Sequence, residues 1–173
     1  MLCVVIDPSG SFNEGKGHTG IAYIKDNDWF KVGTLSVSAK DYQSRHDYWE
    51  AVMRAAFKDS LDNADVTPEE LTVVIESFVI RTNGFTLGKM PETIQFIGAI
   101  AWELENLGVS KVVFQTPSQA KTRFADDQLP SYIPNLVKEE NGFYYLNGKR
   151  INDHVRDALK HLLFFKRYGE YKL

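Results

Sequence analysis

The sequence predicts one α/β domain over residues 1–173, built on a sheet whose strands run in mixed directions and which is covered by helices on its faces. Three observations predict this class. The chain begins with three strand-like segments, and helical and strand-like segments alternate after them. It is also 173 residues long and 43% hydrophobic, so it can bury a sizeable core.

The first three strands are predicted from apolar runs and from the turn between the last two. Residues 2–7, LCVVID, form a short apolar run that ends in an acid, which is typical of a central strand. Residues 19–25 and 29–37 follow, and the turn-like sequence DND separates them. Together the three segments predict an antiparallel meander.

The middle of the chain predicts two helices and two further strands. Residues 46–63 carry apolar side chains at helical spacing. The run 72–80, TVVIESFVI, predicts a buried strand with a single acid, Glu76. A long helix over 91–108 begins with a proline, which is favoured in a first turn, and ends at a glycine. Residues 111–116, KVVFQT, predict the fifth strand.

The C-terminal third predicts a short helix, a hairpin and a last helix. The short helix covers 117–124, PSQAKTRF. Residues 142–151 contain two strand-like pieces on either side of an Asn-Gly pair, which is a hairpin signal. Residues 151–163, INDHVRDALKHLL, predict a core-facing helix that carries acids at the boundary of its apolar face.

Composition and the first residues predict a cytoplasmic protein without a membrane partner. No run approaches the ~18 apolar residues that a membrane span needs, and MLCVVIDPSG lacks the basic region of a signal peptide. The single cysteine, Cys3, suits a reducing compartment. A net charge of −3 argues against indiscriminate nucleic-acid binding. Basic residues nevertheless gather near the C-terminus, at Lys149, Arg150, Arg156, Lys160, Lys166 and Arg167.

Three acids lie where apolar segments are not expected to carry charge. Asp7 ends the first strand, Glu76 lies in the fourth, and Asp157 lies on the last helix. Brought together, they would repel one another and raise each other's pKa unless a cation neutralised them. Carboxylate oxygens suit Mg²⁺ or Mn²⁺. Two such ions ~4 Å apart can activate a water and stabilise the leaving oxygen of a displacement.

The alternative is that each acid has an ordinary structural role. Asp7 would then cap a turn, Glu76 would face solvent, and Asp157 would pair with Arg156 or Lys160. That explanation suffices for any one acid, but the occurrence of all three in this fold order favours a shared metal site.

The order of segments resembles the RuvC-type Holliday junction resolvases of the ribonuclease H-like superfamily, with a bacteriophage member as the expected kind. Residues 4–24, VVIDPSG…TGIAYI, resemble the first hairpin of that family, and 73–84, VVIESFVIRTNG, its glutamate strand and following loop. Residues 117–124 fall where the family has a lysine, and 154–159, HVRDAL, resemble its closing motif. The resemblance implies a ribonuclease H-like mixed five-stranded sheet with helices on both faces, to which this chain adds a small extra hairpin.

Carried over by position, the resemblance implies roles for five residues. Asp7, Glu76 and Asp157 would be ligands of Mg²⁺, with Mn²⁺ as a substitute and two ions in the site. Lys121 would approach the scissile phosphate and stabilise its charge in the transition state. His154 stands where family members have aspartate or histidine, and would ligate metal or bind the phosphate or the attacking water.

Asp153 is the alternative to His154, because the two are adjacent. Asp157 lies three residues after His154 and four after Asp153, so all three could share one helical face, although one residue turns a side chain ~100° around the helix axis. We prefer His154.

The resemblance also implies a surface that contacts DNA. The loop after the glutamate strand would lie at the crossover of a junction, where Phe85, between Gly84 and Thr86, would stack on an unpaired base. Lysine and arginine side chains would contact phosphates. The predicted DNA contacts are Lys16, Arg81, Phe85, Lys89, Lys121 and Arg150.

The predicted activity is that of a crossover junction endodeoxyribonuclease, which resolves four-way DNA junctions by paired phosphodiester hydrolysis and leaves 5′-phosphate and 3′-hydroxyl ends. Paired cuts imply a homodimer. The helix over 91–108 is apolar enough to supply its interface, unless it is fully internal. The alternatives are a terminase-type packaging nuclease, a flap-cutting nuclease on the same fold, or a non-catalytic DNA-binding module.

Overall fold

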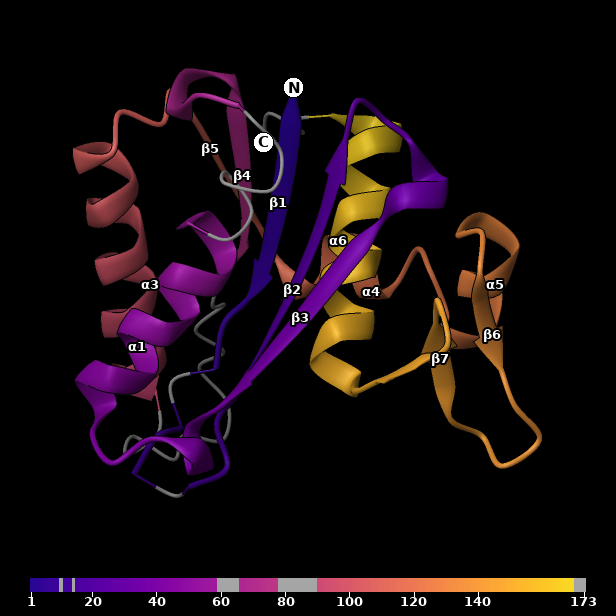
Figure 1. Ribbon diagram of the computed structural model, residues 1–173, viewed down its shortest axis with the longest axis horizontal. Coiled ribbons are helices and arrows are strands. Elements are labelled where there is room, and N and C mark those ends of the chain that lie inside the picture. The colour runs from indigo at the N-terminus through magenta and orange to yellow at the C-terminus, as the bar shows by residue number, and fades with distance from the viewer. Residues whose placement is uncertain (10, 14, 59–65, 78–89, 170–173) are drawn as a thin grey trace.

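The structure is a computed structural model that describes residues 1–9, 11–13, 15–58, 66–77 and 90–169. Its centre is a five-stranded sheet in the order β3-β2-β1-β4-β5 (Figure 1). The strands are β1 (Leu2–Asp7), β2 (His18–Lys25), β3 (Gly33–Ser38), β4 (Leu71–Glu76) and β5 (Lys111–Gln115). The central strand β1 pairs antiparallel with β2 and parallel with β4, so the predicted sheet of mixed direction is confirmed.

Helices cover both faces of this sheet, as predicted. On one face lie α1 (Arg45–Met53) and α3 (Met90–Asn106), and on the other lies α6 (Asp153–Tyr168), with α4 (Pro117–Lys121) beside it (Figure 1). Alternate residues of β1 divide between two buried cores, since side chains of a strand point to opposite faces. Val4 packs on the side of α1 and α3, and Val5 on the side of α6. Among the described residues, no helix has the length and apolar character of a bilayer span.

Several predicted elements differ from the structure in extent. The strand predicted over 72–80 ends at Glu76, and the short helix predicted over 117–124 ends at Lys121. The segment 29–37 is a strand only from Gly33, because Asp28 caps a short 3-10 helix over Trp29–Lys31 by accepting a hydrogen bond from the Phe30 backbone N–H. The helix predicted over 46–63 is α-helical to Met53 and continues as a π-turn to Lys58. Its last predicted residues lie outside the described part of the chain.

The extra hairpin is present, and it belongs to a small second sheet. The strands are β6 (Leu136–Lys138), β7 (Tyr144–Leu146) and β8 (Lys149–Ile151), in the order β6-β7-β8. Asn147 and Gly148 form the turn between β7 and β8, with φ values of 50° and 76°, which these residue types tolerate. This sheet and α5 (Leu129–Tyr132) lie beyond α6, away from α1 and α3 (Figure 1). Buried residues of β7 and β8 join the same core as α6.

The first turn of α6 packs directly on β2 at Gly20. A Cβ atom built on Gly20 would lie 2.2 Å from the carbonyl carbon and oxygen of His154, so only glycine permits this approach. Gly20 is the register partner of Asp7 on β1. The helix begins at Asn152, whose side chain accepts a hydrogen bond from the Val155 backbone N–H at 2.9 Å. The start of α6 is therefore held beside the end of β1.

This packing predicts that Gly20→Ala destabilises the protein. The added methyl group meets backbone atoms that cannot rotate away, so we expect a loss of about 1–3 kcal/mol in the free energy of unfolding, measured by urea denaturation. The control is Gly98→Ala in α3, where a Cβ meets nothing within 4 Å and where alanine should stabilise the helix by up to about 1 kcal/mol. Equal stability of Gly20→Ala and wild type would show that α6 does not pack as described.

Candidate active site

Two strand ends place carboxylates on one face of the sheet. Asp7 is the last residue of β1 and Glu76 the last residue of β4, and the two strands are parallel neighbours. Asp7 follows Val5 by two residues and Glu76 follows Val74 by two, and both valines pack on the α6 side. The sheet therefore presents both carboxylates toward α6.

One stripe of α6 meets these carboxylates. His154, Asp157 and His161 are separated by three and four residues, so they lie on one side of the helix. His154 Nδ1 lies 2.8 Å from Asp7 Oδ2, and His161 Nε2 lies 2.9 Å from Glu76 Oε2. The structure thus brings together all five residues that the sequence predicted as catalytic. We call them the acid cluster: Asp7, Glu76, Lys121, His154 and Asp157.

The Lys121 ammonium joins two acids of the cluster. It donates to Glu76 Oε1 at 3.0 Å and to Asp157 Oδ2 at 2.8 Å. Burial alone would lower the pKa of Lys121, but the charges of Asp7, Asp157 and Glu76 outweigh it and raise the pKa above its ordinary range. Lys121 is therefore a fixed positive charge among carboxylates.

Asp7 is the least neutralised acid of the cluster. Its side chain is buried, which raises its pKa from the ordinary 3.8 to about 6, and the charge of Glu76 adds to the rise while the hydrogen bond from His154 opposes it. The same hydrogen bond to Asp7 raises the pKa of His154, against the effect of burial. The protonated form of His154 and the ionised form of Asp7 therefore stabilise each other.

Glu76 has a second partner that sequence reasoning missed. His161 is fully buried; its Nε2 meets Glu76, and its Nδ1 lies 2.8 Å from Gln115 Oε1. Burial would raise the pKa of Glu76, but the hydrogen bond and charge of His161, with those of Lys121, lower it to about 2. The signal in the sequence was the four-residue spacing between Asp157 and His161, which puts both on one helical face.

A chain of ion pairs links Asp157 to the segment before the small sheet. Lys160 Nζ donates to Asp157 Oδ1 at 2.9 Å and forms an ion pair with Asp126 Oδ1 at 2.5 Å. Arg156 joins Asp126, at 2.9 Å, to Asp153, at 2.8 Å. Asp153 is 85% exposed and points away from the cluster. Its neighbour His154 is therefore the residue that occupies the site.

The predicted DNA contacts fall into three groups: exposed residues, a residue of the acid cluster, and residues outside the described part of the chain. Lys16 is exposed in the loop before β2, and Arg150 is exposed on β8, with its guanidinium 3.5 Å from the centre of the Phe143 ring. Lys121 lies in the acid cluster. Three others lie outside the described residues: Arg81, Phe85 and Lys89.

The sheet order, with its antiparallel β1–β2–β3 meander followed by parallel β4 and β5, is the ribonuclease H-like fold. Two solved structures of RuvC from Thermus thermophilus share it. One, RuvC in complex with a Holliday junction substrate, has a TM-score of 0.63 at 18% identity over 98% of this chain and 94% of that chain. The other, RuvC itself, has a TM-score of 0.55 at 17% identity over 98% and 97% of the two chains. No protein-family model matches the sequence, and neither does any curated protein.

The donor atoms of the acid cluster suit Mg²⁺ or Mn²⁺ in kind, since they are carboxylate oxygens with one imidazole. Within the described ranges, no three His, Cys, Asp or Glu side chains are arranged to hold a metal ion as they stand. Lys121 explains this, because its ammonium already binds Glu76 and Asp157. To hold a metal ion, Glu76 and Asp157 would have to exchange the Lys121 ammonium for it. The residues fit the metal in charge and in ligand type.

The raised pKa of Asp7 predicts a pH-dependent gain in stability for Asp7→Asn in EDTA. A carboxyl whose pKa is raised in the folded state favours folding when protonated, so wild type loses stability as pH rises from about 4 to about 6. The variant has no such loss. We expect its advantage in melting temperature to grow over this range and to stay constant above it.

The control is Asp127→Asn, which removes the same charge from an exposed position. A difference between Asp7→Asn and wild type that is independent of pH would contradict the assignment of a raised pKa to Asp7.

Proposed function

We propose that this chain is a metal-dependent endonuclease of the RuvC type that resolves four-way DNA junctions. The observation that carries the proposal is the acid cluster, in which two strand-end carboxylates and one from α6 converge. The fold supports it, because it is shared over nearly the whole chain with a RuvC bound to a Holliday junction. The origin in a bacteriophage stays a prediction from the sequence.

Asp7, Glu76 and Asp157 would hold two Mg²⁺ ions, or Mn²⁺ in their place. Such ions supply an activated water and charge stabilisation at the leaving oxygen. Lys121, once its carboxylate partners bind metal, is free to contact the scissile phosphate with its ammonium. His154, partly exposed beside Asp7, is placed to bind the phosphate or to orient the attacking water.

The reaction is an in-line displacement at phosphorus. Water attacks, the bond to the 3′ oxygen breaks, and the products carry a 5′-phosphate and a 3′-hydroxyl. His161 touches no substrate in this account. It holds Glu76 in one orientation through a hydrogen bond that is itself fixed by Gln115.

A homodimer would supply two such centres for the two strands of a junction. Part of the predicted interface helix is internal: Phe96, Ile100 and Leu104 of α3 are fully buried. On its outer side, Ile94 is 43% exposed and Trp102 is 65% exposed. These two are the apolar residues that a second copy would cover.

The test of the proposed function is incubation with a labelled four-way junction, a linear duplex and a flap, each with and without Mg²⁺. We expect cleavage of the junction, in symmetrically related strands, only when Mg²⁺ is present. Preference for the flap would favour a flap-cutting nuclease, and equal cutting of the linear duplex would favour a terminase-type enzyme. Binding without cleavage of any substrate would leave a non-catalytic DNA-binding module.

The roles of the acids predict the effect of removing each charge. Asp7→Asn, Glu76→Gln and Asp157→Asn should each lower the rate of junction nicking by about 100-fold or more. Binding of the junction in EDTA should change little, because these three carboxylates make no phosphate contact of their own without metal and the affinity rests on lysine and arginine side chains. Asp127→Asn is the matched control and should nick normally. A variant of the acid cluster with wild-type turnover would remove that residue from the site.

The proposed dimer predicts that Trp102→Glu yields monomers. A charge in an apolar interface is costly to bury, so sedimentation should show half the wild-type mass, and nicking should occur on one strand per encounter. Phe30→Glu is the control, because Phe30 is equally apolar and exposed but lies away from α3. Wild-type protein that is monomeric at micromolar concentration yet makes paired cuts would overturn the dimer.

A further inference from the structure

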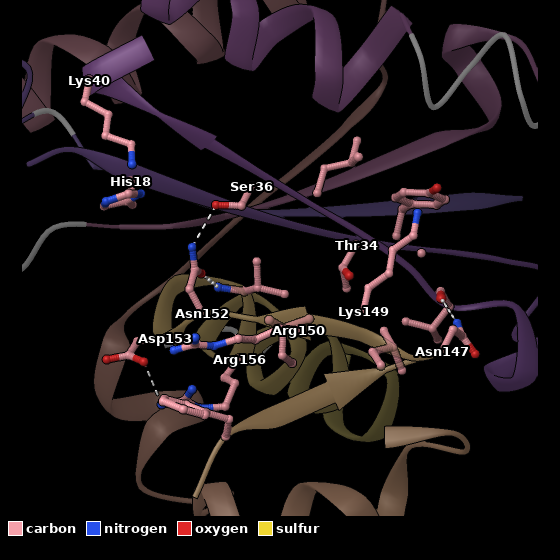
Figure 2. Close-up of a pocket in the computed structure, with 18 residues that line it drawn as sticks. His18, Thr34, Ser36, Lys40, Asn147, Lys149, Arg150, Asn152, Asp153 and Arg156 are labelled. Carbon is pink, nitrogen blue, oxygen red and sulfur yellow. Dashed lines mark hydrogen bonds and ion pairs between the residues drawn. The ribbon is translucent and has the colours of Figure 1, made fainter. Parts of the chain in front are cut away.

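A groove of about 820 Å³ lies beside the acid cluster. It runs between β3, the edge strand of the main sheet, and the β7–β8 hairpin, with the start of α6 at its base (Figure 2). Its volume falls within the range of pockets that hold drug-sized ligands. A DNA double helix, whose major groove alone is ~12 Å wide, is too large to enter it.

One end of the groove adjoins the acid cluster. His18 lines the groove, and its ring stacks against that of His154, with the ring centres 6.3 Å apart. His154 in turn contacts Asp7. A chain lying in the groove would therefore pass directly into the site proposed for hydrolysis.

The walls of the groove carry positive charge. Lys40 extends toward His18 at one end, and Lys149 lies beside Thr34 farther along (Figure 2). Among the described residues, neither lysine has a carboxylate partner, and nor does Arg150. The lining contains one acid, which Arg156 neutralises. A ligand with repeated negative charge suits this lining.

The groove also offers flat surfaces for rings. The Arg150 guanidinium lies over the Phe143 ring, which is 42% exposed. On the opposite wall, the Tyr23 ring lies across Gly33, where a Cβ atom would come within 2.0 Å of it. Cations together with planar side chains are the combination that binds unpaired nucleic-acid strands, since each base has a face to stack.

The floor between these walls is lined by short polar side chains. Thr34 and Ser36 of β3 face it, and Ser36 Oγ accepts a hydrogen bond from the Asn152 side chain at 2.8 Å. Short polar side chains leave room for sugar and phosphate groups and can bond to them.

We propose that this groove binds an unpaired DNA strand that continues from the scissile phosphate. The inference rests on the proposed nuclease function, and it adds that the substrate is single-stranded next to the cut. The strand lies along β3, with its phosphates at Lys40 and Lys149 and a base on the Phe143–Arg150 surface.

Binding of fluorescein-labelled oligothymidylate to the whole protein in EDTA tests the groove without cleavage. Lys40→Ala/Lys149→Ala should weaken binding about tenfold or more. Because each phosphate contact on a single strand contributes ~0.7 to the salt dependence, the slope of log affinity against log salt should fall by about 1.4. Phe143→Ala should weaken binding about tenfold through lost stacking and leave that slope unchanged.

The matched control is Lys31→Ala/Lys58→Ala, which removes the same charge from exposed positions outside the groove. Unchanged affinity and slope in Lys40→Ala/Lys149→Ala would overturn the groove, as would a linear duplex that competes as well as the oligothymidylate. If the groove variants bind oligothymidylate like wild type while the junction is cleaved normally, the groove is refuted and the proposed function stands. Groove-dependent binding with no junction cleavage refutes the proposed function instead.

Discussion

The contact between α6 and the sheet at Gly20 is the constraint on which the site depends. Because no side chain separates them, the first turns of α6 lie within hydrogen-bond reach of the ends of β1 and β4. A single stripe of the helix then contacts the ends of both strands: His154 contacts Asp7 of β1, and His161 contacts Glu76 of β4. A larger residue at position 20 would move this stripe away from both acids at once.

Charge balance decides how the acids differ from one another. Glu76 lies between Lys121 and His161 and has a low pKa, because its hydrogen bonds and electrostatic interactions with these two side chains outweigh its burial. Among the described side chains Asp7 forms a hydrogen bond or ion pair with His154 alone, and its pKa is high, mainly because it is buried. The cluster is therefore short of positive charge at Asp7, which is where a divalent cation would relieve the most unfavourable burial. Lys121 partly fills that need in the protein alone.

Much of this arrangement was predictable, because it depends on local patterns. Asp7 is visible in sequence as a charge that closes an apolar run, and Glu76 as the single acid of a buried strand-like run. The preference for His154 over its neighbour Asp153 followed from the position of His154 in the motif that resembles the RuvC type, and the structure places His154 in the cluster. The Asn-Gly turn likewise predicted the small hairpin.

What could not be predicted depends on contacts between distant segments. The spacing of His161 from Asp157 puts it on the same helical face, but its contact with Glu76 depends on the packing of α6 on the sheet. Gln115 reaches this site because β5 pairs with β4, where it is the register partner of Glu76. Strand β6 is three residues long and carries too little pattern to be recognised. The groove between β3 and β8 joins residues more than a hundred positions apart, so no local signal describes it.

The central claim is that the acid cluster is a divalent-metal centre, and Mn²⁺ binding to the DNA-free protein tests it most directly. Electron paramagnetic resonance measures free Mn²⁺ during a titration of wild type, Asp7→Asn and the control Asp127→Asn. The account predicts that wild type and Asp127→Asn bind Mn²⁺ with up to two ions per chain, and that Asp7→Asn loses most of this binding. Mn²⁺ that stays free with wild type, or binds equally to wild type and Asp7→Asn, would contradict it.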